Sequence, residues 1–139
     1  PSDARLVSVV TPTTPARRWA HANLYECFDR QTWPNKELCV YETGGAAPSA
    51  FWREIMESDG RVRYEHEPSG DSNLGAKRNR LARMARGEVL AHFDDDDCYR
   101  SAYLARMVAG LGASDFAKLR AGNGRRAGKT SNPLGHIEG

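Results

Sequence analysis

Short apolar runs alternate with helical patterns along most of this chain, and this alternation restricts the possible folds more than any other feature. The apolar runs predict strands at residues 6–10, 36–42, 61–67, 88–93 and 114–119, and the patterns between them predict helices at 17–31, 49–58, 76–87 and 101–112. Strands separated by helices form βαβ units, which place parallel strands in one sheet. The sequence therefore predicts an α/β fold, Rossmann-like, with a mostly parallel sheet and helices on both faces.

Prolines and one glycine are expected to set boundaries in this pattern. Pro12 and Pro15 follow the first apolar run, and they predict its end because proline lacks the amide that a sheet needs. Gly87 is the last residue of the third helical pattern, and it predicts the end of that helix. A short first strand followed directly by a loop is therefore expected.

Composition argues against several classes of protein. The 139 residues suit one domain with a substantial core, since 40% of them are apolar. The net charge of +2 is too balanced to predict binding to nucleic acid or to a membrane surface, and no run of eighteen apolar residues predicts a membrane span. The cysteines, Cys27, Cys39 and Cys98, form no CxxC pair. They predict neither disulfides nor a zinc site, and they favour a reducing, cytoplasmic location.

Four consecutive aspartates follow the strand predicted at 88–93, in "EVLAHFDDDDCYR". If the strand stays extended, alternate side chains share a face, so Asp94 and Asp96 would point one way and Asp95 and Asp97 the other. Carboxylates without nearby His or Cys favour Mg²⁺ or Mn²⁺, and Mg²⁺ commonly completes its shell with phosphate oxygens. The aspartates therefore predict a metal-bound phosphate or diphosphate. A solvated acidic turn is the alternative.

Other polar residues also follow predicted strands. Pro12 and Thr13 come after the first strand and Glu42 after the second, and open parallel sheets bind ligands beyond the carboxyl ends of their strands. One cleft is expected to collect them with the aspartates. Lys77 and Arg78 lie near the start of a predicted helix, where the helix dipole also favours an anion. A solvated basic face remains open for both.

Five segments carry a resemblance to a known family. The segments "VSVVTPT", "NKELCVYE", "NLGAKRN", "ARGEVLAHFDDDDCY" and "SDFAKL" occur in this order and resemble the nucleotide-binding half of family 2 glycosyltransferases, which have the GT-A fold and a DXD motif. The resemblance covers most of residues 5–119. It implies a nucleotide-sugar-binding domain at 1–119 whose acceptor half is missing. Residues 120–139 are expected, from their own sequence, to form a basic, flexible tail.

The resemblance implies transfer of a sugar from a nucleotide diphosphate sugar, expected to be a UDP-sugar, to an acceptor hydroxyl on a glycan, lipid or protein. It also implies an inverting, metal-dependent reaction, with Asp94 and Asp96 holding Mn²⁺ or Mg²⁺ against the diphosphate. Glu42 stands where the family usually has an aspartate that hydrogen-bonds the base or ribose. The implied nucleotide-sugar-binding residues are Pro12, Thr13, Glu42, Asn73, Lys77, Arg78, Asp94 and Asp95.

The catalytic base is left unassigned. In inverting members of the family it lies well downstream of the DXD motif, and neither Asp115 nor Glu138 fits that role. The chain is therefore expected to be a truncated donor-binding half. Two alternatives remain: a nucleotide-sugar-binding module without transfer activity, and a metal-dependent nucleotidyltransferase. The second is disfavoured because "TPTTPARR" lacks the glycine expected after the first strand.

Overall fold

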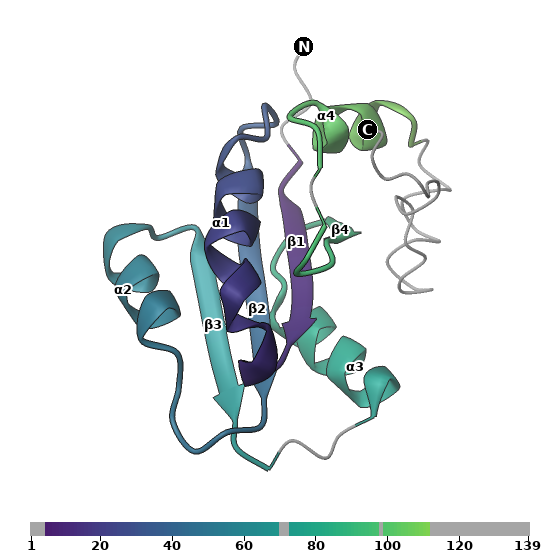
Figure 1. Ribbon diagram of the computed structural model, residues 1–139. Helices are drawn as coiled ribbons and strands as arrows, with labels where there is room; N and C mark the ends of the chain where they lie inside the picture. Colours follow the sequence, from purple (N-terminus) through teal and green to yellow (C-terminus); the bar gives the residue numbers. More distant parts are fainter. Residues whose placement is uncertain (1–4, 70–72, 98, 112–139) are drawn as a thin grey trace.

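The computed structural model describes residues 5–69, 73–97 and 99–111 (Figure 1). Its strands are β1 (Val7–Thr13), β2 (Lys36–Thr43), β3 (Val62–Glu67) and β4 (Val89–His92). Its helices are α1 (His21–Asp29), α2 (Ala50–Ser58), α3 (Leu74–Met84) and α4 (Tyr103–Ala109), with a 3₁₀ helix, η1 (Pro15–Ala20), before α1. The predicted alternation is confirmed for these elements. The strand predicted at 114–119 and the tail predicted at 120–139 lie outside the described residues.

All four strands are parallel and lie in the order β3-β2-β1-β4. The chain proceeds from β1 to β2 and β3 on one side, and it then returns to place β4 on the other side of β1. Ligands of open parallel sheets bind at the carboxyl ends of the two strands where the winding reverses. Here β1 and β4 are those strands, so the segments that follow them occupy the switch point.

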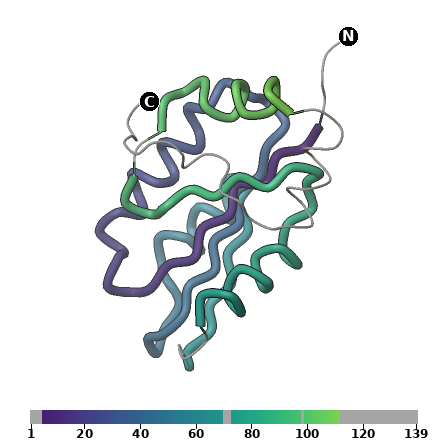
Figure 2. The backbone as a smooth tube through the Cα atoms, turned by 90° about the vertical axis from the view of Figure 1, so that its right-hand side faces the viewer, coloured from purple at the N-terminus to yellow at the C-terminus, as the bar shows by residue number. Residues whose placement is uncertain are grey.

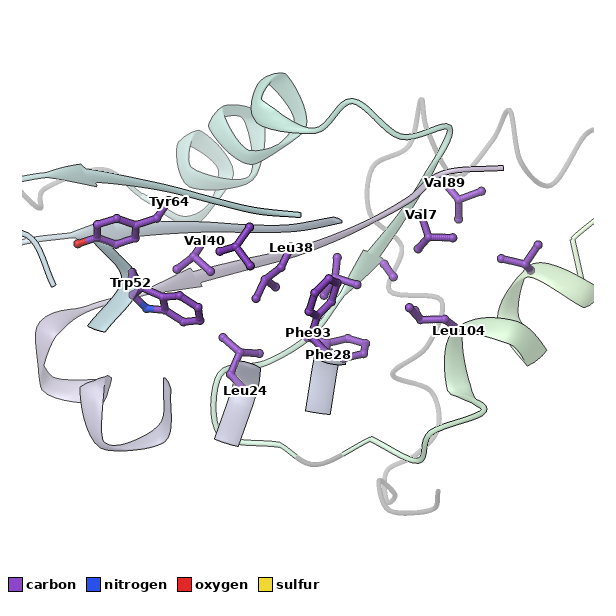
Figure 3. Packing of buried hydrophobic residues seen from close by; sticks show 14 residues of the cluster. Val7, Leu24, Phe28, Leu38, Val40, Trp52, Tyr64, Val89, Phe93 and Leu104 are labelled. Atoms are coloured by element: carbon purple, nitrogen blue, oxygen red, sulfur yellow. The ribbon is translucent and has the colours of Figure 1, made fainter. Parts of the chain in front are cut away.

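Apolar residues at alternate strand positions form a core on each face of the sheet. The larger core packs α1, α2 and α4 against one face, and the smaller core packs α3 against the other. Figure 2 shows how the backbone of the helices lies about the sheet, and Figure 3 shows side chains of the larger core. Phe28 and Trp52 are fully buried in the larger core, and burying a side chain of this kind stabilises the fold by roughly 2–3 kcal/mol. The prediction of helices on both faces is confirmed.

β1 is longer than predicted because Pro12 belongs to the strand. The strand pairs with β2 as far as Thr13, whereas its pairing with β4 ends at Val10. The Val10 carbonyl accepts a hydrogen bond from the Phe93 amide at 3.2 Å, and backbone polar groups two residues apart face the same side of a strand. Pro12 therefore faces the side where β4 has ended, and its missing amide costs no ladder hydrogen bond. The prediction that Pro12 ends the strand is wrong.

The helix predicted at 17–31 is divided into two parts. Pro15 lies in the first turn of η1, where its fixed φ angle suits a helix start, and α1 begins only at His21. Arg17 and Arg18 are consequently carried by η1, a few residues after Thr13. This short helix places two cations beside the carboxyl ends of the strands.

Gly87 was predicted to end a helix, and this prediction is wrong because α3 already ends at Met84. Gly87 instead allows a close approach to β1. A Cβ atom at this position would lie 2.5 Å from Ser8 Oγ and 2.6 Å from the carbonyl oxygen of Leu6. The turn between α3 and β4 therefore requires a residue without a side chain.

Membrane spans and cysteines, both considered from composition, can be examined in the described part of the chain. No helix within it is long and apolar enough to cross a membrane. Cys27 and Cys39 are buried free thiols, whereas Cys98 falls outside the described residues.

Candidate functional site

The polar residues predicted to act together lie at the carboxyl edge of the sheet. Thr13 is the last residue of β1, and its register partner on β2 is Glu42. Asp94 and Asp95 follow β4 after Phe93. These strand ends therefore lie at one edge of the sheet, and the cleft expected there stays a prediction.

A chain of hydrogen bonds joins Thr13 to Asp95. Thr13 Oγ1 donates to Asp95 Oδ2 at 2.7 Å and lies 2.8 Å from His21 Nε2. Trp52 Nε1 donates to His21 Nδ1 at 2.9 Å, so Nδ1 carries no proton and Nε2 is the ring donor. Each donor in this chain has one acceptor, which fixes the orientation of the Asp95 carboxylate. Burial lowers the pKa of His21, in agreement with a neutral ring.

Arg17 bridges two adjacent aspartates. Its Nη2 atom lies 3.0 Å from Asp95 Oδ1 and 2.6 Å from Asp96 Oδ2. β4 has ended by this point, and a turn closes with a 3.3 Å hydrogen bond from the Asp97 amide to the Asp94 carbonyl. The expectation that neighbouring aspartates face opposite ways is therefore wrong for Asp95 and Asp96, because the alternation rule applies only to extended backbone.

Glu42 is fully buried, and its carboxylate is already engaged by residues of this chain. Arg18 donates to both carboxylate oxygens at 2.8 Å, and the Tyr64 hydroxyl donates to Oε1 at 2.6 Å. Burial acts to raise the pKa of Glu42, but the hydrogen bonds from Arg18 and Tyr64 outweigh it and lower the pKa. Arg18 also donates to the Ala47 carbonyl, and 36% of its side chain is exposed. Arg18 is therefore the partly exposed member of this pair.

The remaining predicted residues lie at or near the start of α3, which follows β3. Asn73 Oδ1 accepts a hydrogen bond from the Ala76 amide at 2.8 Å and so caps the helix. Lys77 and Arg78 lie in the first turn and a half, as predicted. Neither has an ion-pair partner in the parts of the chain that the structure describes. Their charges are consequently available to an anion, although no contact joins them to the aspartates.

The donor set suits a hard cation completed by a ligand. No cluster of three or more His, Cys, Asp or Glu side chains that could hold a metal forms among the described residues. Mg²⁺ and Mn²⁺ do not need such a cluster when phosphate oxygens and water supply the other positions. The guanidinium of Arg17 already stands as a cation between Asp95 and Asp96. Arg17 thus pairs with one of the two predicted metal ligands, Asp96, and its other partner is Asp95 in place of the predicted Asp94.

Sequence reasoning missed the cationic half of this site. Arg17, Arg18 and His21 belong to "PARRWAH", the segment that follows the first strand directly. A signal was present, because ligands of parallel sheets bind at such segments and two adjacent arginines there are suited to pair with carboxylates or phosphates. Tyr64 gave no comparable signal, since its position predicts only a strand.

Comparisons with known proteins find similarity to glycosyltransferases. The family described as Glycosyl transferase family 2 matches residues 8–121. "Putative glycosyltransferase EpsH" from Bacillus subtilis (strain 168) is 32% identical over 88 residues, which make up 63% of this chain and 25% of EpsH.

Solved structures share the fold at lower identity. The mannosyltransferase PcManGT from Pyrobaculum calidifontis, in complex with GDP-Man and Mn²⁺, superposes with a TM-score of 0.65 at 22% identity, over 77% of this chain and 32% of PcManGT. TarS 1-349 from S. aureus, in complex with UDP, gives a TM-score of 0.63 at 19% identity, over 76% of this chain and 31% of TarS. The chain spans about a quarter to a third of the length of these proteins. Its fold is of the GT-A type, and the chain belongs to glycosyl transferase family 2.

Proposed function

We propose that this chain is the donor-binding part of a glycosyltransferase that moves a sugar from a nucleotide diphosphate sugar, expected to be a UDP-sugar, to an acceptor hydroxyl. The family match and the GT-A fold support the reaction class. The observation that carries the proposal is the aspartate turn at the switch point, where carboxylates converge on a cation. In this proposal residues 1–119 form the nucleotide-sugar-binding domain.

The aspartates would form a DXD motif. Asp94 and Asp96 would hold Mn²⁺ or Mg²⁺, and the complex of PcManGT with GDP-Man and Mn²⁺ supports this choice of ion. A divalent cation bound there would stabilise the negative charge that develops on the leaving diphosphate. Asp95 would contribute by positioning, since its bond to Thr13 and the bridge to Arg17 fix the turn that carries its neighbours.

The other predicted residues would bind the nucleotide. Pro12 and Thr13 end β1 at the switch point, where the nucleoside is expected, and Asn73 fixes the start of α3. Lys77 and Arg78 would attract the diphosphate through charge and the helix dipole. Glu42 would act through Arg18, because its own oxygens are already engaged. The acceptor, the inverting outcome and the catalytic base belong to the whole protein and remain predictions.

Calorimetry on the full chain tests this proposal. UDP and GDP should each be titrated with and without Mn²⁺, into the wild type and into Asp96→Asn. We expect at least one nucleotide to bind only with Mn²⁺, and the substitution to weaken binding by at least about tenfold, the loss typical of a damaged metal site. Glu57→Gln, an exposed neutralisation on α2, serves as the matched control and should bind normally. Equal binding by Asp96→Asn, or binding without metal, would contradict the metal assignment.

A further inference from the structure

We propose that Arg17 exchanges partners when the donor binds: it neutralises Asp96 in the free chain, and it moves to the diphosphate once a divalent cation takes its place. This inference rests on the proposed function and adds a residue to the donor site that neither the sequence pattern nor the family match assigns. Three features of Arg17 and its surroundings support it.

The first feature is that Arg17 pairs with Asp96, a carboxylate that the proposed metal would need. The same Nη2 atom contacts Asp95 and Asp96, at 3.0 and 2.6 Å. A divalent cation on Asp96 would stand next to the guanidinium, and like charges at that separation repel strongly unless one of them moves. Metal and Arg17 are therefore competitors for Asp96.

The second feature is that one aspartate is fixed while the other is free to change partner. Asp95 is held by Thr13, which is backed by buried His21 and Trp52. The Asp96 side chain is 40% exposed and pairs with Arg17. The more exposed contact is the one that a metal can replace at small cost, since exposed ion pairs contribute little to stability.

The third feature is an unused donor on Arg17. Its Nε atom is buried yet donates to no acceptor among the described residues. A buried donor without an acceptor is unfavourable, and it gains a partner when a phosphate oxygen arrives. Arginine is suited to this change because its planar fork binds carboxylate and phosphate with the same geometry.

The test measures two affinities that should change in opposite directions. In Arg17→Met, calorimetry with Mn²⁺ alone should show tighter binding than in the wild type, because the internal competitor is gone. Titration of UDP or GDP at saturating Mn²⁺ should show binding weaker by about tenfold, the loss of one charge-assisted hydrogen bond. A residue with a merely structural role would weaken both. Arg53→Met, on the exposed face of α2, removes the same charge elsewhere and should change neither affinity.

A second measurement follows the movement of Arg17 in the wild-type chain through the fluorescence of Trp19. Trp19 is 72% exposed, and the Arg17 guanidinium carbon lies 5.8 Å from the centre of its ring. Movement of Arg17 should alter Trp19 fluorescence, obtained as the difference between the wild type and Trp19→Phe. We expect Mg²⁺ with UDP or GDP to change this signal in the wild type but not in Arg17→Met.

The outcomes separate this inference from the proposed function. If the wild type binds a nucleotide with metal, but Arg17→Met shows unchanged affinities or the Trp19 signal stays constant, the exchange is refuted and donor binding stands. If the wild type binds neither nucleotide with metal, the proposed function fails and the exchange fails with it.

Discussion

β2 carries a buried glutamate near each end, and the two glutamates are held in different ways. Glu37, at the amino end, accepts hydrogen bonds from the Ser8 hydroxyl at 2.6 Å and from the Arg86 amide at 2.7 Å. Ser8 Oγ also accepts from the Gly87 amide at 2.8 Å. Glu42, at the carboxyl end, is held by side chains alone, of which Arg18 is partly exposed.

The difference separates a structural network from a candidate ligand site. At the amino end the backbone amides of Arg86 and Gly87 donate into the network, and they cannot leave without unfolding the turn after α3. The exposed Arg86 guanidinium adds one further contact to Glu37, at 3.2 Å. At the carboxyl end the partners are the long side chains of Arg17 and Arg18, which can turn toward a ligand while the strands stay in place. Burial acts to raise the pKa of both glutamates, and hydrogen bonds outweigh it in both. The charge and burial of the two glutamates therefore do not show which end of the sheet binds a ligand.

The largest effect is expected from breaking the amino-end network. Glu37→Ala leaves the Ser8 hydroxyl and the Arg86 amide without their buried acceptor, and it should lower the free energy of unfolding by about 3 kcal/mol. Urea denaturation measures this loss, and Glu57→Ala on exposed α2 should stay within about 0.5 kcal/mol of the wild type. The comparison predicts unchanged nucleotide affinity for the folded fraction. Weakened nucleotide binding without a loss of stability would reverse the assignment of the two ends.

A smaller loss is expected from Gly87→Ala. The added methyl group would meet Ser8 Oγ and the Leu6 carbonyl at less than van der Waals distance, so the turn must shift, at a cost of about 1–3 kcal/mol. Gly60→Ala is the matched control, because nothing lies within 4 Å of a Cβ atom there. Thermal unfolding of both variants gives the comparison. Equal melting temperatures would mean that the approach of Gly87 to β1 is not tight.

The smallest effect concerns the carboxyl end and depends on pH. His21 is buried and neutral with a lowered pKa, whereas in the unfolded chain its pKa is about 6.5. As the pH falls below about 6.5, His21 takes up a proton in the unfolded chain before it does so in the folded chain. Its contribution to the free energy of unfolding is therefore fully present above about pH 6.5, and it is lost as the pH falls toward the lower pKa that His21 has in the folded chain. His21 alone changes the free energy of unfolding by at most about 1.4 kcal/mol per pH unit.

Urea midpoints between pH 7.5 and 5.5 measure the slope. His21→Gln should flatten it, whereas His66→Gln, on a partly buried histidine outside the hydrogen-bond chain, should keep it. A slope that survives the loss of His21 would show that another group titrates in this range.

Much of the fold could be predicted from the sequence because apolar periodicity records burial. The strands around Val9, Leu38 and Val62 lie in short runs of β-branched or apolar residues, and helical patterns separate these runs along the chain. The extension of β1 through Pro12 could not be predicted, because it depends on where the neighbouring strand ends. The role of Gly87 likewise depends on contact with β1 and not on the helix before it.

The candidate site was predicted in part for the same reason. The acidic residues could be placed because they follow apolar strands, and the sheet order brings Thr13 beside Asp95. The partners of these acids could not be derived from spacing, since η1 is a local deviation from the predicted helix. The alternation argument also failed after His92, where the backbone turns.

Amide chemical-shift mapping of the full chain tests the central claim most directly, namely that the carboxyl end of the sheet binds a nucleotide diphosphate with metal while the amino end is structural. UDP or GDP is added with Mg²⁺, which does not broaden the signals. The account predicts shifts at Thr13, Arg17 and Asp95, and unchanged signals at Ser8, Glu37 and Gly87. Shifts confined to the amino-end residues, or absent from both ends, would contradict it.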